Sequence, residues 1–385
     1  MENFENKIAT IIPFLDKIKD VRVDRHKKYP LNEIVFLVLV SVMSGNKSCD
    51  EFVEFGKAKI NWFKKYMPYK NEIPSSDTLR RVFSLIDYKE FEQYFTEWAK
   101  NGIKLSNEKI ISIDGKVLRK SSTKLEHQTK LEEGGKRPIY LLHAWCSDLK
   151  YCLGQLSMAS KANEVSTIPK LLSMLDIENS IVTIDAAGCQ TAIAEQIIKA
   201  DANYIFSLKD DKKALLEAVK TGFLDEKNQD KITIYNQDEK RKGHNEKRIY
   251  HAMPIEFLEN NENIQKEWAG LKTIVKVNYT RHENFKNQES IDFFFITSLS
   301  VKVENLAKLV RSHWSIENNL HWTLDVIFKE DDSKNRNKNT ATNLSTIRKC
   351  AINLLKGMAT DKLVSIKKMQ HKLLLWDDLR SAIFD

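Results

Sequence analysis

Residues 109–115 read KIISIDG, a short run of apolar and β-branched residues that ends in Asp114 and Gly115. Such a run predicts a buried strand. The same pattern returns at residues 180–186, SIVTIDA, where Asp185 follows the apolar run. The sequence therefore predicts two buried strands of the same pattern, each followed directly by an Asp.

Further short elements surround these two strands. A hairpin is predicted over residues 138–156, with the turn SDLK at 147–150. A helical pattern at 191–200 then leads to another strand at 204–208. Because strands joined by a helix pair in parallel, we expect a mixed sheet with both hairpin and helix-joined strands. The predicted fold class is α/β.

Helical periodicity dominates both ends of the chain. Residues 1–105 carry aromatic and aliphatic side chains at three-to-four spacing. In that stretch a Ser or Asp of residues 75–77 is expected to cap a helix that begins near Thr78. Arg80, on the same helix, is either a solvated charge or a DNA contact. We expect a helical region at 1–105, a core at 106–330 and a helical region at 331–385.

The core is expected to contain an insertion at about residues 214–300. A helix opens this segment, and β-rich pieces follow at 232–235, 271–277 and 291–296. After the insertion an amphipathic helix is predicted from Val303 to Phe328, with apolar residues at i, i+3, i+4 and i+7.

The composition points to a polyanionic partner. Lys and Arg number 61 against 53 Asp and Glu, a net charge of +8. The five cysteines are scattered without a CxxC pair, which is typical of reduced thiols in the cytosol. The acidic amino terminus does not resemble a secretory signal, and the apolar stretch at 34–43 is about half the ~20 residues of a membrane span. We expect that stretch to be a buried helix.

Asp114 and Asp185 suggest a shared site. If their strands are parallel neighbours, the two acids lie about one strand spacing, ~5 Å, apart. Carboxylates this close repel each other unless a cation lies between them. The alternative is ordinary turn chemistry, because Asp is common where a chain leaves a strand.

Glu317 is the third acid of interest. It falls inside the apolar stripe of the helix at 303–328, between Trp314 and Leu320, so we expect it to point toward the sheet. A buried carboxylate needs a positive partner. That partner is either His313 or His321 on the same helix face, or a divalent metal ion held together with Asp114 and Asp185.

The chemistry of three carboxylates favours Mg²⁺ or Mn²⁺. Hard oxygen ligands without Cys select these ions over Zn²⁺. Two such ions about 3.5–4 Å apart are the arrangement used for in-line phosphodiester chemistry. If a metal ion is the partner, the residues predict a two-metal site that acts on a nucleic acid.

Three motifs resemble the DDE transposases of bacterial insertion sequences, in particular their H-repeat-associated, ISAs-type branch. They are IDGKVLR at 113–119, TIDA at 183–186 and RSHWSIENNLHWTLDV at 311–326, and the last is highly specific. The resemblance covers nearly the whole chain. IPSSDT at 73–78 resembles the branch's amino-terminal associated domain, and FKED at 328–331, with Arg336, Asn339 and Asn343-Leu344, resembles its carboxyl-terminal signature.

This resemblance implies a ribonuclease-H-like core in which Asp114, Asp185 and Glu317 are the catalytic residues and the ligands of two Mg²⁺ (or Mn²⁺) ions. It further implies nicking at element ends and attack of the freed 3′-hydroxyl on target DNA. The expected partners are double-stranded DNA and a second copy of the chain, without a membrane or a small-molecule cofactor. A cytoplasmic, nucleoid-associated location is expected.

The chain also departs from the family pattern. Val310 replaces a Tyr and His313 replaces an Arg of the wider group, and the loop around residues 243–248 is about two residues shorter than expected. Six residues are candidate DNA contacts: Lys116, Arg119, Arg311, His313, Trp322 and Arg336. Trp322 is expected either to pack or to stack on an unpaired base.

Basic clusters could add phosphate contacts. They lie at 209–213, at 240–242 with 247–248, and at 334–349. For each cluster, a solvated surface is the alternative. Two rival functions also stay open: a nuclease of the same core without strand transfer, and a non-catalytic DNA-binding remnant of a mobile element.

Overall fold

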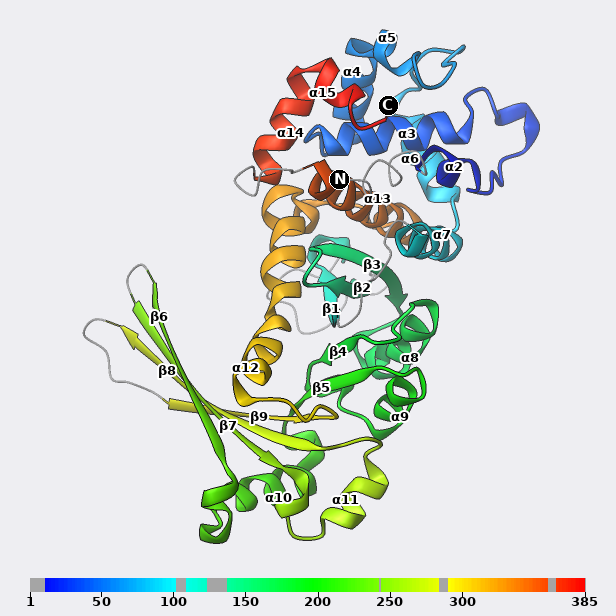
Figure 1. Cartoon of the computed structure of the whole chain (residues 1–385). Coiled ribbons are helices and arrows are strands. Elements are labelled where there is room, and N and C mark those ends of the chain that lie inside the picture. The colour runs from blue at the N-terminus through cyan, green and yellow to red at the C-terminus, as the bar shows by residue number, and fades with distance from the viewer. Residues whose placement is uncertain are drawn as a thin grey trace. The chain divides into compact units, whose positions relative to one another are not determined.

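The chain forms two units, neither of which is continuous in sequence. One comprises residues 1–105, 115–163 and 317–385, and the other comprises 106–114 and 164–316. The computed structural model describes residues 11–101, 109–122, 137–241, 244–283, 290–358 and 365–384 (Figure 1). We call the two parts the first and the second unit.

Helices from both ends of the chain make up most of the first unit. The amino-terminal ones are α2 (Ile11–Asp16), α3 (Leu31–Met43), α4 (Cys49–Ala58), α5 (Ile60–Phe63), α6 (Ser76–Leu85) and α7 (Tyr88–Asn101). The carboxyl-terminal ones are α13 (Lys338–Met358), α14 (Ile366–Leu375) and α15 (Asp377–Ser381). Because α13 packs against α3, α6 and α7, the two expected helical regions share one core.

Helix α3 confirms the interpretation of the apolar stretch at 34–43. It spans only 13 residues, and its side chains from Ile34 to Met43 are buried. Within the residues that the structure describes, no helix combines the length and the apolar character needed to cross a membrane.

Helix α6 begins as its sequence predicts. The backbone N–H of Thr78 donates to Oγ of Ser75, which therefore caps the helix. Arg80 on this helix forms ion pairs with Asp50 at 2.8 Å and Asp77 at 2.7 Å.

The predicted hairpin is present in the first unit. Strands β2 (Ile139–Cys146) and β3 (Tyr151–Met158) pair antiparallel, with an irregularity between Ala144 and Trp145. The strand order continues from β3 and β2 to β1 (Ile110–Leu118), whose first half belongs to the second unit.

The second unit holds the rest of the strands. They are β4 (Ile181–Ile184), β5 (Asn203–Leu208), β6 (Thr233–Arg241), β7 (His244–Pro254), β8 (Thr273–Glu283) and β9 (Ser290–Thr297). Strands β1, β4 and β5 are parallel neighbours, and β9, β8, β7 and β6 follow antiparallel. Helices α8 (Glu164–Met174), α9 (Thr191–Lys199), α10 (Lys213–Leu224) and α11 (Asn261–Glu267) connect them. The expected mixed α/β class is confirmed.

The β-rich insertion is part of the core sheet, because its last strand, β9, pairs with β5. The long green and yellow strands of Figure 1 show this extension. The stretch from His244 onward is strand β7 rather than a loop. It pairs with β6 from His244 to Ala252 and with β8 along its whole length. Its many charged residues concealed its strand character, while Lys242 and Gly243 lie outside the described residues.

The long helix predicted from Val303 to Phe328 changes its winding part-way. Helix α12 (Val303–Ser312) is followed by two π-helical segments, η8 (Ile316–His321) and η9 (Thr323–Ile327). Leu306, Ala307 and Val310 of α12 pack on Tyr250, Val275 and Phe295 of the sheet, with Trp314 at the edge of this core. The wider π turns shift the helix phase after this point.

Candidate active site

Asp114 and Asp185 occupy equivalent positions on neighbouring strands. The register of the parallel pair β1 and β4 sets Ile113 opposite Ile184, so the next residues along both strands are the two acids. Neighbouring strands lie about 4.8 Å apart, and equivalent positions of parallel neighbours face the same side of a sheet. Both residues are partly exposed. The second unit therefore holds two carboxylates side by side on one face.

Turn chemistry does not account for either acid. Strand β1 continues past Asp114 and Gly115 to Leu118, so the expectation that the strand ends at Asp114 is wrong. Asp185 does precede a turn, but its carboxylate makes no capping hydrogen bond there. The backbone carbonyl of Asp185 accepts from Gly188 N–H, which leaves its side chain unused by the turn.

A chain of hydrogen bonds joins the two strands to α12, two residues before each acid. Oγ1 of Thr183 donates to Oγ of Ser112 at 3.0 Å, and Oγ of Ser112 donates to the carbonyl of Ser312 at 3.4 Å. Nδ1 of His313 lies 3.1 Å from the same Thr183 oxygen. Since residues two apart on a strand share a face, this chain marks the face that carries Asp114 and Asp185.

His313 is thus directed inward. Burial lowers the pKa of its imidazole, although the negative charge of Asp185 acts in the opposite direction. The position where the wider family has an Arg therefore carries a side chain bonded within the second unit. Ser112 and Thr183 were not among the expected site residues. Their signal was a small polar residue two positions before each acid in otherwise apolar strands.

Glu317 does not point into the core as expected. It is exposed, while its neighbours Ile316 and Leu320 are fully buried. Glu317 is the second residue of η8, where the winding changes from α to π. Within the described part of the chain its carboxylate makes no ion pair, so the expected pairing with His313 or His321 is not formed.

No preformed metal cage accompanies these acids. Across the described ranges, no three side chains of His, Cys, Asp or Glu are grouped so that they could hold a metal ion. The carboxylates are instead distributed over two parts of the chain: Asp114 and Asp185 in the second unit, and Glu317 at the start of the last segment of the first.

Comparison with known proteins identifies the family. The model of the transposase DDE domain matches residues 105–354, and that of the DDE_Tnp_1-associated domain matches residues 12–99. The chain belongs to the DDE transposase family.

Relatives span nearly the whole transposase. A protein of Escherichia coli O157:H7 named "Putative transposase YncI" is 32% identical over 375 residues, which is 96% of this chain and 92% of the relative. The E. coli K12 protein named "H repeat-associated putative transposase YhhI" is 33% identical, with 91% of both chains covered. A piggyBac transposase synaptic complex with hairpin DNA aligns with a TM-score of 0.47 and 10% identity, covering all of this chain and 78% of the other.

Lys116 of the transposase has a role other than the expected phosphate contact. Its ammonium lies 2.7 Å from Asp325, 3.0 Å from Asp331 and 3.8 Å from Glu330, and its side chain is buried. Burial acts to lower the pKa of Lys116, but the carboxylates outweigh it and raise the pKa. The protein's own acids thus hold this lysine.

The acid at the centre of this cluster is Glu330, which is almost fully buried. Its carboxylate accepts from Oγ of Ser345 at 2.7 Å and lies within 4.0 Å of Arg348 and Lys349. Burial acts to raise the pKa of Glu330, but the charge of Lys349 and the other cations outweighs it and lowers the pKa. Lys349 is fully buried, so the expectation of a surface cluster at 334–349 is wrong for its last two residues.

Arg311 is also engaged within the protein. Its guanidinium lies 3.2 Å from Glu239 of β6, in a group with Arg248, which pairs with Glu246 at 2.7 Å. This ion pair links α12 to the insertion strands. The remaining candidate contacts, Arg119, Trp322 and Arg336, are exposed, and Arg119 pairs with Asp331 at 3.2 Å.

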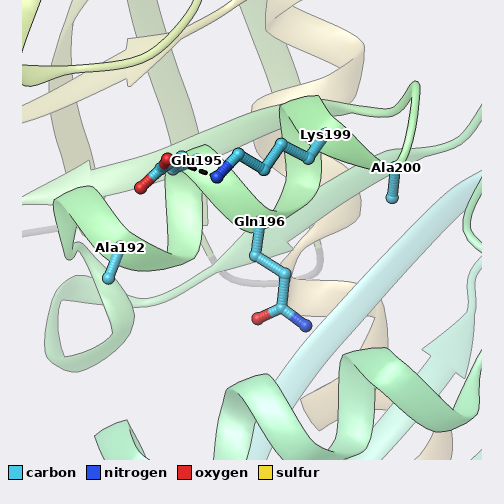
Figure 2. Close-up of a pocket in the computed structure, with 5 residues that line it drawn as sticks. All are labelled: Ala192, Glu195, Gln196, Lys199 and Ala200. Carbon is cyan, nitrogen blue, oxygen red and sulfur yellow. Dashed lines mark ion pairs between the residues drawn. The ribbon is translucent and has the colours of Figure 1, made fainter.

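A hollow of about 300 Å³ on the second unit is unrelated to these residues. It lies along α9 and is lined by Ala192, Glu195, Gln196, Lys199 and Ala200, with Glu195 and Lys199 ion-paired across one turn (Figure 2). None of the candidate site residues lines it.

Thr183→Val tests the hydrogen-bond chain. The change keeps the side-chain shape but removes the hydroxyl that bonds His313 and Ser112. We expect the free energy of unfolding to fall by about 1–3 kcal/mol in urea titrations, because buried polar groups lose their partner. Thr183→Ser, which keeps the hydroxyl, is expected to retain most of that stability. Equal stability of Thr183→Val and the wild type would contradict this series of hydrogen bonds.

Glu330→Gln tests the buried ion cluster. Removing one charge of a buried group of ions is expected to lower the free energy of unfolding by roughly 3–5 kcal/mol at pH 7. The pKa of folded Glu330 lies below its ordinary 4.5, so its contribution is present above that pH and is lost as the pH falls through the folded value. The two proteins should therefore converge in acid. Glu54→Gln, in an exposed pair with Lys57, is the control and should change little.

Proposed function

We propose that this transposase cleaves DNA at the ends of its element and joins the freed 3′-hydroxyl to target DNA. The observation that carries the proposal is the pair of strands that set Asp114 beside Asp185 on one face. Family membership supports the same reaction class. Double-stranded DNA, with terminal inverted repeats, is the proposed substrate, and we expect a homodimer at the nucleoid.

The donor set fits Mg²⁺ or Mn²⁺. Asp114, Asp185 and Glu317 supply only carboxylate oxygens, the ligands that these hard cations prefer. In the described part of the chain, the Asp185 and Glu317 side chains have no hydrogen bond or ion pair, so both are available. When bound, two ions would activate the attacking oxygen and stabilise the leaving one.

The protein's own residues hold and orient the carboxylates. In our proposal Asp114 and Asp185 hold the ions, and Glu317, exposed on η8, completes the site. The hydrogen bonds of Thr183 with Ser112 and His313 fix strands β1 and β4 against the end of α12. The chain therefore begins η8 with a defined rotation about the helix axis. The exposed Arg119, Trp322 and Arg336 are proposed to contact DNA.

Asp185→Asn tests the proposed chemistry. Removing one charged oxygen ligand is expected to lower Mg²⁺-dependent nicking of terminal-repeat DNA by more than about 100-fold. DNA binding should stay within about twofold, because the residue holds ions rather than the DNA backbone. Nicking by gel assay and affinity by fluorescence anisotropy measure the two effects.

Asp176→Asn is the matched control, because it makes the same change at an exposed position of the second unit. It should cut at the wild-type rate. Cleavage retained by Asp185→Asn would refute the assignment.

A pre-cut end offered with target DNA separates a transposase from a nuclease, which would not join it. Wild-type protein that binds DNA without cutting it would instead indicate a non-catalytic remnant.

A further inference from the structure

Two adjoining hollows on the first unit have a strongly basic lining. The first, about 420 Å³, lies between the start of α4, α6 and the segment before α13. The second, about 520 Å³, lies between the end of α3, η9 and α14. Lys47 and Lys329 line both hollows, which we call together the lysine groove.

The charge of the lysine groove is far from the average of the chain. Among the described residues that line it, the cations are Lys47, Arg80, Lys329, Lys334, Arg348, Lys367 and Lys368, and the one carboxylate is Asp332. The whole chain has nearly as many acids as bases, so a ratio of seven to one marks this surface. The concentration of positive charge in a concave surface raises the local attraction for a polyanion.

Five of these cations are available to a ligand. Arg80 is paired with Asp50 and Asp77, and Arg348 with buried Glu330. The five lysines are exposed, and none forms an ion pair within the residues that the structure describes. Asp332 is held by Lys120 at 2.7 Å; this pairing lowers its pKa, and the charges of Lys329 and Lys47 lower it further.

Two helices add positive ends to the groove. Ser48 caps α4 by accepting from Glu51 N–H, and Ser365 caps α14 by accepting from Lys368 N–H. Ser48 lines the first hollow and Ser365 the second. The amino-terminal end of a helix carries partial positive charge and favours phosphate groups.

Lys329 has an unusual backbone. Its φ of 53° and ψ of 42° lie in the left-handed region, which an L side chain adopts at a cost of about 1 kcal/mol or more. A glycine would adopt this conformation freely, yet the chain places a lysine where the two hollows meet. The strained position suggests a use for the charge of this side chain.

We infer that the lysine groove binds the phosphate backbone of double-stranded DNA and that Lys47 and Lys329 are its central contacts. This inference rests on the proposed function, because it names where the transposase holds its DNA outside the carboxylate site. Lysine contacts to phosphate carry no sequence information, so the groove contributes affinity that is equal for all DNA sequences.

The test uses the full-length protein with Lys47→Ala and Lys329→Gly combined. We expect weaker binding to both terminal-repeat and unrelated duplex DNA. The slope of log affinity against log salt should fall by about 2, since each lost phosphate contact removes about 0.9. Lys65→Ala with Lys89→Ala is the matched control, because it removes the same charge from exposed lysines that do not line the groove.

Single variants distinguish an effect of the lysine charge on DNA affinity from a loss of folding stability. Lys329→Gly relieves the left-handed strain, so its melting temperature should equal or exceed that of the wild type while its DNA affinity falls. Lys329→Arg should restore affinity. Asp332→Asn should strengthen binding, because it removes the one carboxylate of the groove.

Three results would overturn the inference: an unchanged salt slope, an equal loss in the control pair, or a loss confined to one DNA sequence. These outcomes are independent of the chemistry at Asp185. If the groove variants bind normally while Asp185→Asn still abolishes nicking, only the groove is refuted. If the groove variants bind weakly while Asp185→Asn still cuts, only the proposed reaction is refuted.

Discussion

The parallel pairing of β1 with β4 is the constraint on which the candidate chemistry depends. It sets Ile113 opposite Ile184, and this register brings two like charges, Asp114 and Asp185, to adjacent positions on one face. Like charges on neighbouring strands destabilise a sheet unless something compensates them. The buried hydroxyls of Ser112 and Thr183 hold the strands together directly before this point of repulsion. The register thus places the like charges of Asp114 and Asp185 together. A divalent cation bound between them would relieve their repulsion.

The helix that follows the insertion is adapted to two different tasks. As α12 it is a regular amphipathic helix whose apolar face covers the extended sheet. From Ile316 onward it winds as a π-helix, and Glu317 becomes exposed while Ile316 and Leu320 stay buried. π segments are often found at functional positions, because they re-aim side chains without breaking the helix. Here the π segment begins one residue before the exposed carboxylate of Glu317.

Positive charge has two distinct uses in the first unit. Lys116, Arg348 and Lys349 are buried around Glu330 and contribute to the fold. Lys47 and Lys329 are exposed between two hollows and make no ion pair among the described residues. Lys329 and Glu330 are neighbours in sequence, yet Lys329 is exposed in the groove whereas Glu330 is buried among the cations of the first group. Net charge alone therefore predicts a polyanionic partner but not the surface that meets it.

The sequence by itself determined the local elements and the family. The apolar runs before Asp114 and Asp185, the Ser75 cap and the specific motif at 311–326 depend on short-range patterns, and the structure contains the corresponding strands and helices. Strand β7, the exposure of Glu317 and the internal pairing of Lys116 and Arg311 did not follow from the sequence. Each depends on partners far away in the chain: β6 and β8 pair the charged strand, and carboxylates of other segments neutralise the two cations. Only the tertiary structure decided these features, because local periodicity records the spacing of residues and not which distant charges or strands they meet.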